Sequence, residues 1–80
     1  MQLTVAEATA KRLQAVMTEK GVTKEELAER THLPLKKIEK ILNAEYKDVA
    51  VNTVFTISRA MDMPLTEFYQ DEVFLSDNLL

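Results

Sequence analysis

The apolar positions of this chain recur at intervals of three and four residues, which is the period of an amphipathic α-helix. Residues 4–20 follow this pattern, with alanines and larger apolar side chains separated by lysines and glutamates. Lys20 lies in the last turn of this segment, and Gly21, the single glycine of the sequence, is suited to the left-handed conformation that ends a helix. A first helix is therefore expected to end at Gly21.

A second helix has the clearest start signal in the sequence. Thr23 is a good N-cap residue, and Glu26 three positions later completes a capping box. Val22 and Leu27 occupy the two positions of a hydrophobic staple across the same helix start. These signals predict a short helix from residue 24 to about residue 31.

Three further helices are predicted beyond an interruption at His32-Leu33-Pro34. Pro34 suits the first turn of a helix, where its missing N–H costs nothing. After a loop at 44–51, helical spacing returns until Met63-Pro64 breaks it. The predicted helices cover about 34–44, 52–62 and 65–70. Because no segment has the pattern of a strand, we expect an all-α, five-helix fold.

Length and composition narrow the class of protein. The 80 residues are expected to form one domain, 1–80, with a core at about 6–74 and a flexible tail at 75–80. There is no cysteine, so disulfide and thiol chemistry are excluded, and a zinc site would depend on His32 with carboxylates. The apolar runs are too short to span a membrane, and the N-terminus lacks the pattern of a signal peptide. We expect a cytoplasmic protein with no metal, cofactor or small-molecule ligand.

Charge is distributed unevenly along the sequence. Residues 1–61 contain all ten lysines and arginines and eight acidic residues, whereas residues 62–80 contain five acidic residues and no basic one. The formal net charge of −3 therefore arises at the C-terminal end. The acidic total does not exclude a polyanionic ligand for the rest of the chain.

The predicted second and third helices meet the packing demands of a helix-turn-helix unit. Such helices cross closely, which requires a small residue, and Ala28 provides one. Apolar residues must also join the pair from both sides. Those spaced to do so are Leu27, Leu33, Ile38 and Ile41. The turn departs from the usual pattern in His32, which stands where glycine is common.

The predicted third helix has an apolar side and a polar side. The apolar side consists of Leu35, Ile38, Ile41 and Leu42, and the polar side of Lys36, Lys40 and Asn43 with Lys37 at its edge. Lysine can bind phosphate oxygens or guanine O6 and N7, and asparagine can pair with adenine. The polar side is suited to a polyanion, although lysines are also common on any solvated helix.

These features together closely resemble the phage-repressor/Cro-type helix-turn-helix family, also called the xenobiotic-response-element type. The resemblance extends over about residues 6–74. It is carried by Glu19-Lys20-Gly21-Val22-Thr23, Leu27-Ala28-Glu29, Leu33-Pro34, Ile38-Glu39-Lys40-Ile41-Leu42-Asn43, Ile57-Ser58-Arg59-Ala60-Met61 and Pro64-Leu65-Thr66-Glu67-Phe68-Tyr69. It implies five helices, duplex DNA as the partner, the third helix in the major groove and, usually, a dimer on paired half-sites.

The predicted DNA-binding residues follow from this resemblance and from the polar side of the third helix. They are Thr23, Lys24, Leu35, Lys36, Lys37, Lys40, Asn43 and Lys47. Those implied to contact base edges are Leu35, Lys36 and Lys40. Leu35 is equally suited to core packing, and Thr23 to acting only as a helix cap. Lys24 and Lys47 match positions where family members contact the DNA backbone, and the helix dipole assists at Lys24.

Three residues depart from the family pattern. His32 replaces glycine at the turn, and histidine tolerates a left-handed backbone only moderately. Ala44 stands where glycine usually follows Asn43, which affects the path of the loop. Pro34 replaces a serine or threonine and so removes a hydroxyl that caps the helix and contacts phosphate.

The predicted function is therefore a sequence-specific, duplex-DNA-binding transcriptional regulator that acts as a repressor. An enzyme is not expected, because adjacent Glu25 and Glu26 point in different directions on a helix and the chain has no glycine-rich phosphate loop. The alternative is a protein-interaction module of the same fold that has lost DNA binding. The acidic total and the presence of Glu39 on the basic side favour that alternative.

A homodimer through the C-terminal end is a separate prediction. A lone helix-turn-helix contacts few base pairs, and two-fold pairing extends the site. The candidate interface residues are Phe68, Tyr69, Val73, Phe74 and Leu75. The same residues are equally suited to covering the core.

Overall fold

The computed structural model describes residues 2–75 and 79, so most of the tail predicted at 75–80 lies outside it. The elements in this part of the chain are α1 (Val5–Lys20), α2 (Lys24–Thr31), α3 (Leu35–Leu42), α4 (Val51–Ala60), α5 (Leu65–Phe68) and the short 3₁₀ helix η1 (Glu72–Phe74). Leu3 and Leu79 form an isolated parallel β-bridge. Apart from this bridge, the described residues form no β-structure. The predicted all-α fold with five helices is confirmed.

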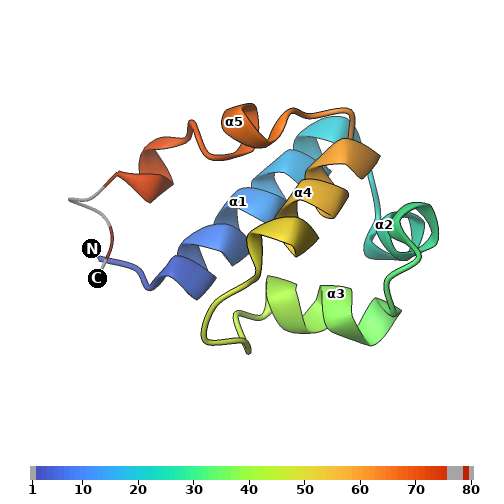
Figure 1. The fold of residues 1–80 in the computed structure, drawn as a ribbon, viewed down its shortest axis with the longest axis horizontal. Coiled ribbons are helices and arrows are strands. Elements are labelled where there is room, and N and C mark those ends of the chain that lie inside the picture. Colours follow the sequence, from blue (N-terminus) through green and yellow to red (C-terminus); the bar gives the residue numbers. More distant parts are fainter. Residues whose placement is uncertain (1, 76–78, 80) are drawn as a thin grey trace.

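Helix α1 runs through the middle of the molecule and contacts elements on both sides (Figure 1). α3 packs against α1 and α2, α4 packs against α2 and α5, and η1 packs against α1. α5 and η1 lie at the opposite edge of the molecule from α3 (Figure 1). The helix-turn-helix and the C-terminal segment therefore occupy different sides.

Capping boxes begin both α1 and α2. At α2 the Thr23 hydroxyl accepts a hydrogen bond from the Glu26 N–H at 3.1 Å, and the Glu26 carboxylate accepts one from the Thr23 N–H at 3.1 Å. These bonds lower the pKa of the Glu26 carboxyl, because they stabilise its ionised form. The box predicted at α2 is confirmed, and Thr4 and Glu7 form an unpredicted second box at α1.

Helices α3, α4 and α5 are shorter than predicted. Pro34 precedes α3 as its N-cap, with φ −59° and ψ 138°, so its placement in the first turn was wrong. α3 ends before Asn43, because Ala44 has φ 56°, outside the right-handed helical region. Asp62 likewise has φ 55°, so α4 ends at residue 60 instead of 62. α5 ends at residue 68 instead of 70: the Tyr69 N–H still bonds to the Leu65 carbonyl, but the Gln70 N–H bonds to the Glu67 carbonyl, only three residues back.

The hydrophobic core is shared by all five helices. Its largest fully buried apolar side chains are Leu13 and Val16 of α1, Leu27 of α2, Ile38 and Ile41 of α3, Val54 and Ile57 of α4, and Phe68 of α5. Met17, Met61 and Met63 complete the buried cluster. The apolar residues that carry the helical spacing of α4 are thus buried, as their spacing predicts.

Arg12 joins α1 to the C-terminal segment. Its Nε donates a hydrogen bond to the Phe68 carbonyl at 2.8 Å, and one Nη donates to the Glu67 carbonyl at 3.0 Å. The other Nη lies 3.5 Å from Asp71 Oδ2, and the guanidinium lies over the Phe68 ring. Because the Arg12 side chain is only 13% exposed, water competes little for these bonds. They hold the end of α5 and Asp71 against α1.

The C-terminal aromatic residues pack against one another. The rings of Phe68, Tyr69 and Phe74 have centroid separations between 4.9 and 6.1 Å, in edge-to-face or tilted arrangements. Val73 is 8% exposed, whereas Leu75 is 59% exposed. Most of this segment therefore covers the core, and Leu75 lies at the surface.

We expect Arg12→Met to lower the free energy of unfolding by about 2 kcal/mol, since it removes charged hydrogen bonds while keeping an apolar stem. Urea unfolding followed by circular dichroism measures this change. Lys11→Met, at the adjacent exposed position of α1, is the matched control and should change stability by less than about 0.5 kcal/mol. Equal losses in the two variants would contradict the role given to Arg12.

Candidate nucleic-acid interface

The helix-turn-helix consists of α2, a turn at residues 32–34 and α3. Leu27, Ile38 and Ile41 are at most 1% exposed, and Ala28 and Leu33 pack against the same cluster. The predicted contacts between the two helices are therefore confirmed. Their burial determines which side of α3 faces the core.

The turn contains one residue in the left-handed backbone conformation, although the usual glycine is absent. His32 ends α2 with φ 61° and ψ 18°. For a residue with a Cβ this conformation costs roughly 1–2 kcal/mol. The Thr31 hydroxyl supports the turn, because it accepts a hydrogen bond from the Leu33 N–H at 3.2 Å and donates one to the Leu27 carbonyl at 2.7 Å.

Leu35 lies at the edge of the apolar side of α3. It is 36% exposed and does not belong to the core cluster, so of the two roles left open for it, core packing is wrong. At about 100° per residue, Leu35 lies about 60° around the helix axis from Ile38, and it is also the first residue of α3. Its side chain is therefore accessible to a ligand that binds the polar side of α3.

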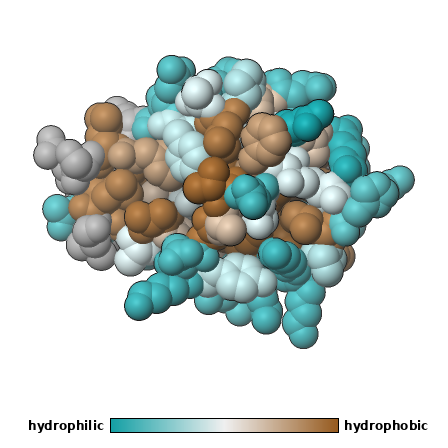
Figure 2. All heavy atoms as spheres, in the orientation of Figure 1, coloured by the Kyte–Doolittle hydropathy of each residue, from teal (hydrophilic) through white to brown (hydrophobic). Residues whose placement is uncertain are grey.

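The predicted DNA-binding residues differ in exposure. Thr23, Leu35, Lys36, Asn43 and Lys47 are exposed, and Lys24, Lys37 and Lys40 are half-buried. Figure 2 shows that hydrophilic side chains gather at the edge of the molecule where Figure 1 places α3. The side of α3 opposite its buried isoleucines is thus polar and accessible.

Lys24 is paired with a residue of α3. Its Nζ lies 2.8 Å from Glu39 Oε2, and the two side chains are 43% and 39% exposed. The hydrogen bond from Lys24 to Glu39 raises the pKa of the Lys24 ammonium. Sequence reasoning assigned Lys24 to the DNA backbone and counted Glu39 only as an acidic residue on the basic side. It missed the pair, because no helical spacing relates positions in two different helices.

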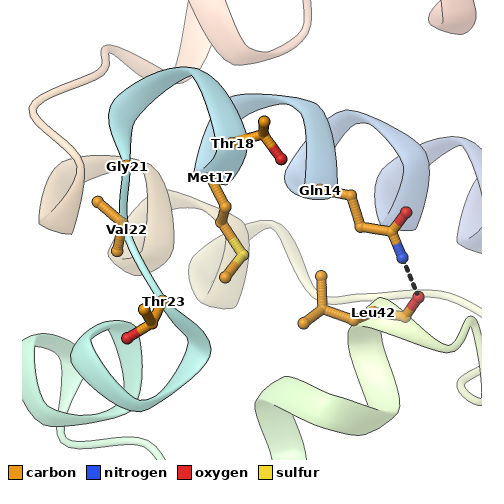
Figure 3. Close-up of a pocket in the computed structure, with 7 residues that line it drawn as sticks. All are labelled: Gln14, Met17, Thr18, Gly21, Val22, Thr23 and Leu42. Atoms are coloured by element: carbon orange, nitrogen blue, oxygen red, sulfur yellow. Dashed lines mark hydrogen bonds between the residues drawn. The ribbon is translucent and has the colours of Figure 1, made fainter.

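A hollow of about 560 Å³ lies beside the start of α2, between α1 and the end of α3. Its seven lining residues are labelled in Figure 3 and come from α1, the segment at 21–23 and Leu42. Gln14 Nε2 donates a hydrogen bond to the Leu42 carbonyl at 3.2 Å (Figure 3). This bond ties the last turn of α3 to α1 and satisfies a carbonyl that the helix itself leaves free.

Residues 2–75 and 79 contain no group of three or more histidine, cysteine, aspartate or glutamate residues arranged to hold a metal ion. None of the helices in this part of the chain is both long and apolar enough to cross a membrane.

A close helix pair, a tight turn and an accessible lysine-bearing second helix define a helix-turn-helix domain. The family model of the Cro/C1-type HTH DNA-binding domain matches residues 12–72. The chain therefore belongs to the Cro/C1-type helix-turn-helix family, and the predicted resemblance is confirmed. Comparisons with curated proteins and with solved structures found no match.

We expect Ala44→Gly to raise the free energy of unfolding by up to about 1 kcal/mol, because glycine adopts the observed φ of 56° without a steric cost. Thermal and urea unfolding measure the change. Ala15→Gly is the matched control: it makes the same chemical change at an exposed position inside α1, where glycine should cost about 1 kcal/mol. A loss of stability at both positions would show that the loop at Ala44 is not strained.

Proposed function

We propose that this protein is a transcriptional regulator that binds specific duplex DNA sequences through α3 in the major groove. The observation that carries the proposal is the orientation of α3 in a chain of a DNA-binding family. Burial of Ile38 and Ile41 turns the side with Lys36, Lys40 and Asn43 away from the core. The major groove admits an α-helix, and each base pair presents a distinct set of donors and acceptors there.

The proposed contacts divide between the DNA backbone and the bases. The start of α2 combines Lys24 with the positive end of a helix dipole, which favours a phosphate. Lys47 in the loop after α3 is exposed and suits a second phosphate. Leu35 and Lys36 begin α3, where side chains approach base edges: leucine suits a thymine methyl group and lysine suits guanine.

The acidic C-terminal end is compatible with this proposal. α5 and η1 lie on the opposite edge from α3 (Figure 1). The carboxylate of Asp71 lies 3.5 Å from an Nη of Arg12, which offsets its charge. Repulsion between Glu67 of α5 and DNA is weakened by distance, since salt screens interactions between exposed charges beyond about 8 Å at physiological ionic strength.

We further propose that the protein represses transcription as a dimer on paired half-sites. A domain that occupies its site excludes other proteins from the same DNA. Phe68 and Val73 are buried in the core, which narrows the predicted dimer surface to Tyr69, Phe74 and Leu75. Leu75 is 59% exposed, and it is the apolar residue of this group most accessible to a second copy.

We expect Lys36→Ala, Lys40→Ala and Lys47→Ala, combined in one variant, to weaken DNA binding without unfolding the domain. Each lost phosphate contact should reduce the slope of log K against log salt by about 0.9. Fluorescence anisotropy with a random duplex at several salt concentrations measures this. The control combines Lys11→Ala, Lys20→Ala and Arg59→Ala, which removes the same charge at other exposed positions.

Backbone amide shifts during the same titration test the location of the interface. Shifts at Thr23, Lys24 and Lys47 and along residues 35–43, fading as salt rises, are expected for docking through this side. Full affinity in the triple-lysine variant, or equal losses in the control, would reject the assignment. No shifts even at low salt would favour the alternative of a protein-interaction module.

We expect Leu75→Asp to shift a dimer toward monomer, because it places a charge in the proposed apolar contact. Sedimentation equilibrium at high protein concentration, without DNA, measures the association. Since Leu75 is exposed, the substitution should leave the melting temperature of the monomer nearly unchanged. A wild-type chain that stays monomeric under these conditions would contradict a constitutive dimer.

A further inference from the structure

Glu39 lies among the residues that the proposed function assigns to DNA. It is one helical turn from Lys36 and from Asn43, the C-cap of α3, so it lies beside both on the polar side. Its side chain is 39% exposed. An acidic residue at this position is unfavourable for nonspecific DNA binding, because phosphates repel it.

The ion pair with Lys24 fixes where this carboxylate lies. Glu39 Oε2 accepts a hydrogen bond from Lys24 Nζ at 2.8 Å, and among the described residues the side-chain hydrogen bonds of Glu39 involve Oε2 alone. Lys24 is the first residue of α2, so the pair spans the two helices of the motif. Exposed ion pairs of this kind add little to folding stability, so a gain in stability does not explain why this pair is present.

A carboxylate that loses water at an interface requires hydrogen-bond donors. Lys24 supplies one donor to Glu39 and offsets its charge. In the major groove, the amino group at N4 of cytosine is the base-edge donor that glutamate recognises. Guanine and thymine would instead leave a desolvated carboxylate facing acceptors, and adenine presents its amino group beside the N7 acceptor.

We propose that Glu39 is a specificity-determining residue: held by Lys24 at the DNA-facing side of α3, it accepts a hydrogen bond from a cytosine amino group. The proposal rests on the proposed function, because it requires α3 to enter the major groove. Glu39 then lowers affinity for random DNA and favours sites with cytosine at one position of each half-site.

Selection from randomised duplexes, followed by sequencing of the bound fraction, tests this with the wild-type chain and Glu39→Gln. The wild type should select cytosine at one position, and the variant should lose this preference by about tenfold or more. Glutamine instead pairs with adenine N6 and N7, so the preference should move toward adenine. Affinity for a fixed random duplex should rise severalfold.

The matched control is Glu67→Gln, which makes the same change at an exposed residue of α5, on the opposite edge from α3 (Figure 1). It should leave the selected sequences unchanged. Lys24→Gln removes the ammonium that holds Glu39, so it should weaken binding overall and reduce the cytosine preference without moving it toward adenine. Thermal unfolding of all three variants checks that each remains folded.

The outcomes separate this proposal from the function on which it rests. A wild-type chain that binds no DNA overturns both. Selective binding with the same sequence preference in wild type and Glu39→Gln overturns only the role of Glu39. A rise in random-duplex affinity without any change in the selected sequences also overturns it, since Glu39 would then act by repulsion alone.

Discussion

Ile38 and Ile41 are almost completely buried where α3 packs against α1 and α2. Neither side chain can leave the core without exposing apolar surface to water, so together they fix the rotation of α3 about its axis. The position of the lysines, the exposure of Leu35 and the approach of Glu39 to Lys24 all follow from this rotation. The polar side of the motif is therefore a consequence of packing on its other side.

Positive φ angles at residues other than glycine recur at helix ends in this chain. His32, Ala44 and Asp62 have φ values of 61°, 56° and 55°, and they follow α2, α3 and α4. Each costs some conformational energy, which the buried contacts of the adjoining helices offset. A residue with a Cβ at these positions therefore lowers stability, and the chain still adopts the left-handed conformation there.

Among the described residues, two ion pairs join distant segments, and they differ in their surroundings. Arg12 is 13% exposed and also donates hydrogen bonds to backbone carbonyls, so its pairing with Asp71 belongs to the fold. Lys24 and Glu39 are each about 40% exposed, so water and ligands can reach them. The burial of Arg12 therefore marks a structural pairing, whereas the Lys24–Glu39 pair is accessible to a nucleic acid.

The sequence alone determined the features that depend on neighbours within a turn or two of chain. The Thr23 capping box, the helix end at Gly21 and the apolar spacing of α3 and α4 are local, and they placed the helix-turn-helix and its family correctly. Tertiary structure alone decided the exposure of Leu35, the contacts of Arg12 with the C-terminal segment and the Lys24–Glu39 pair. Those features depend on distances between segments that packing brings together, and no periodicity in the chain encodes such distances.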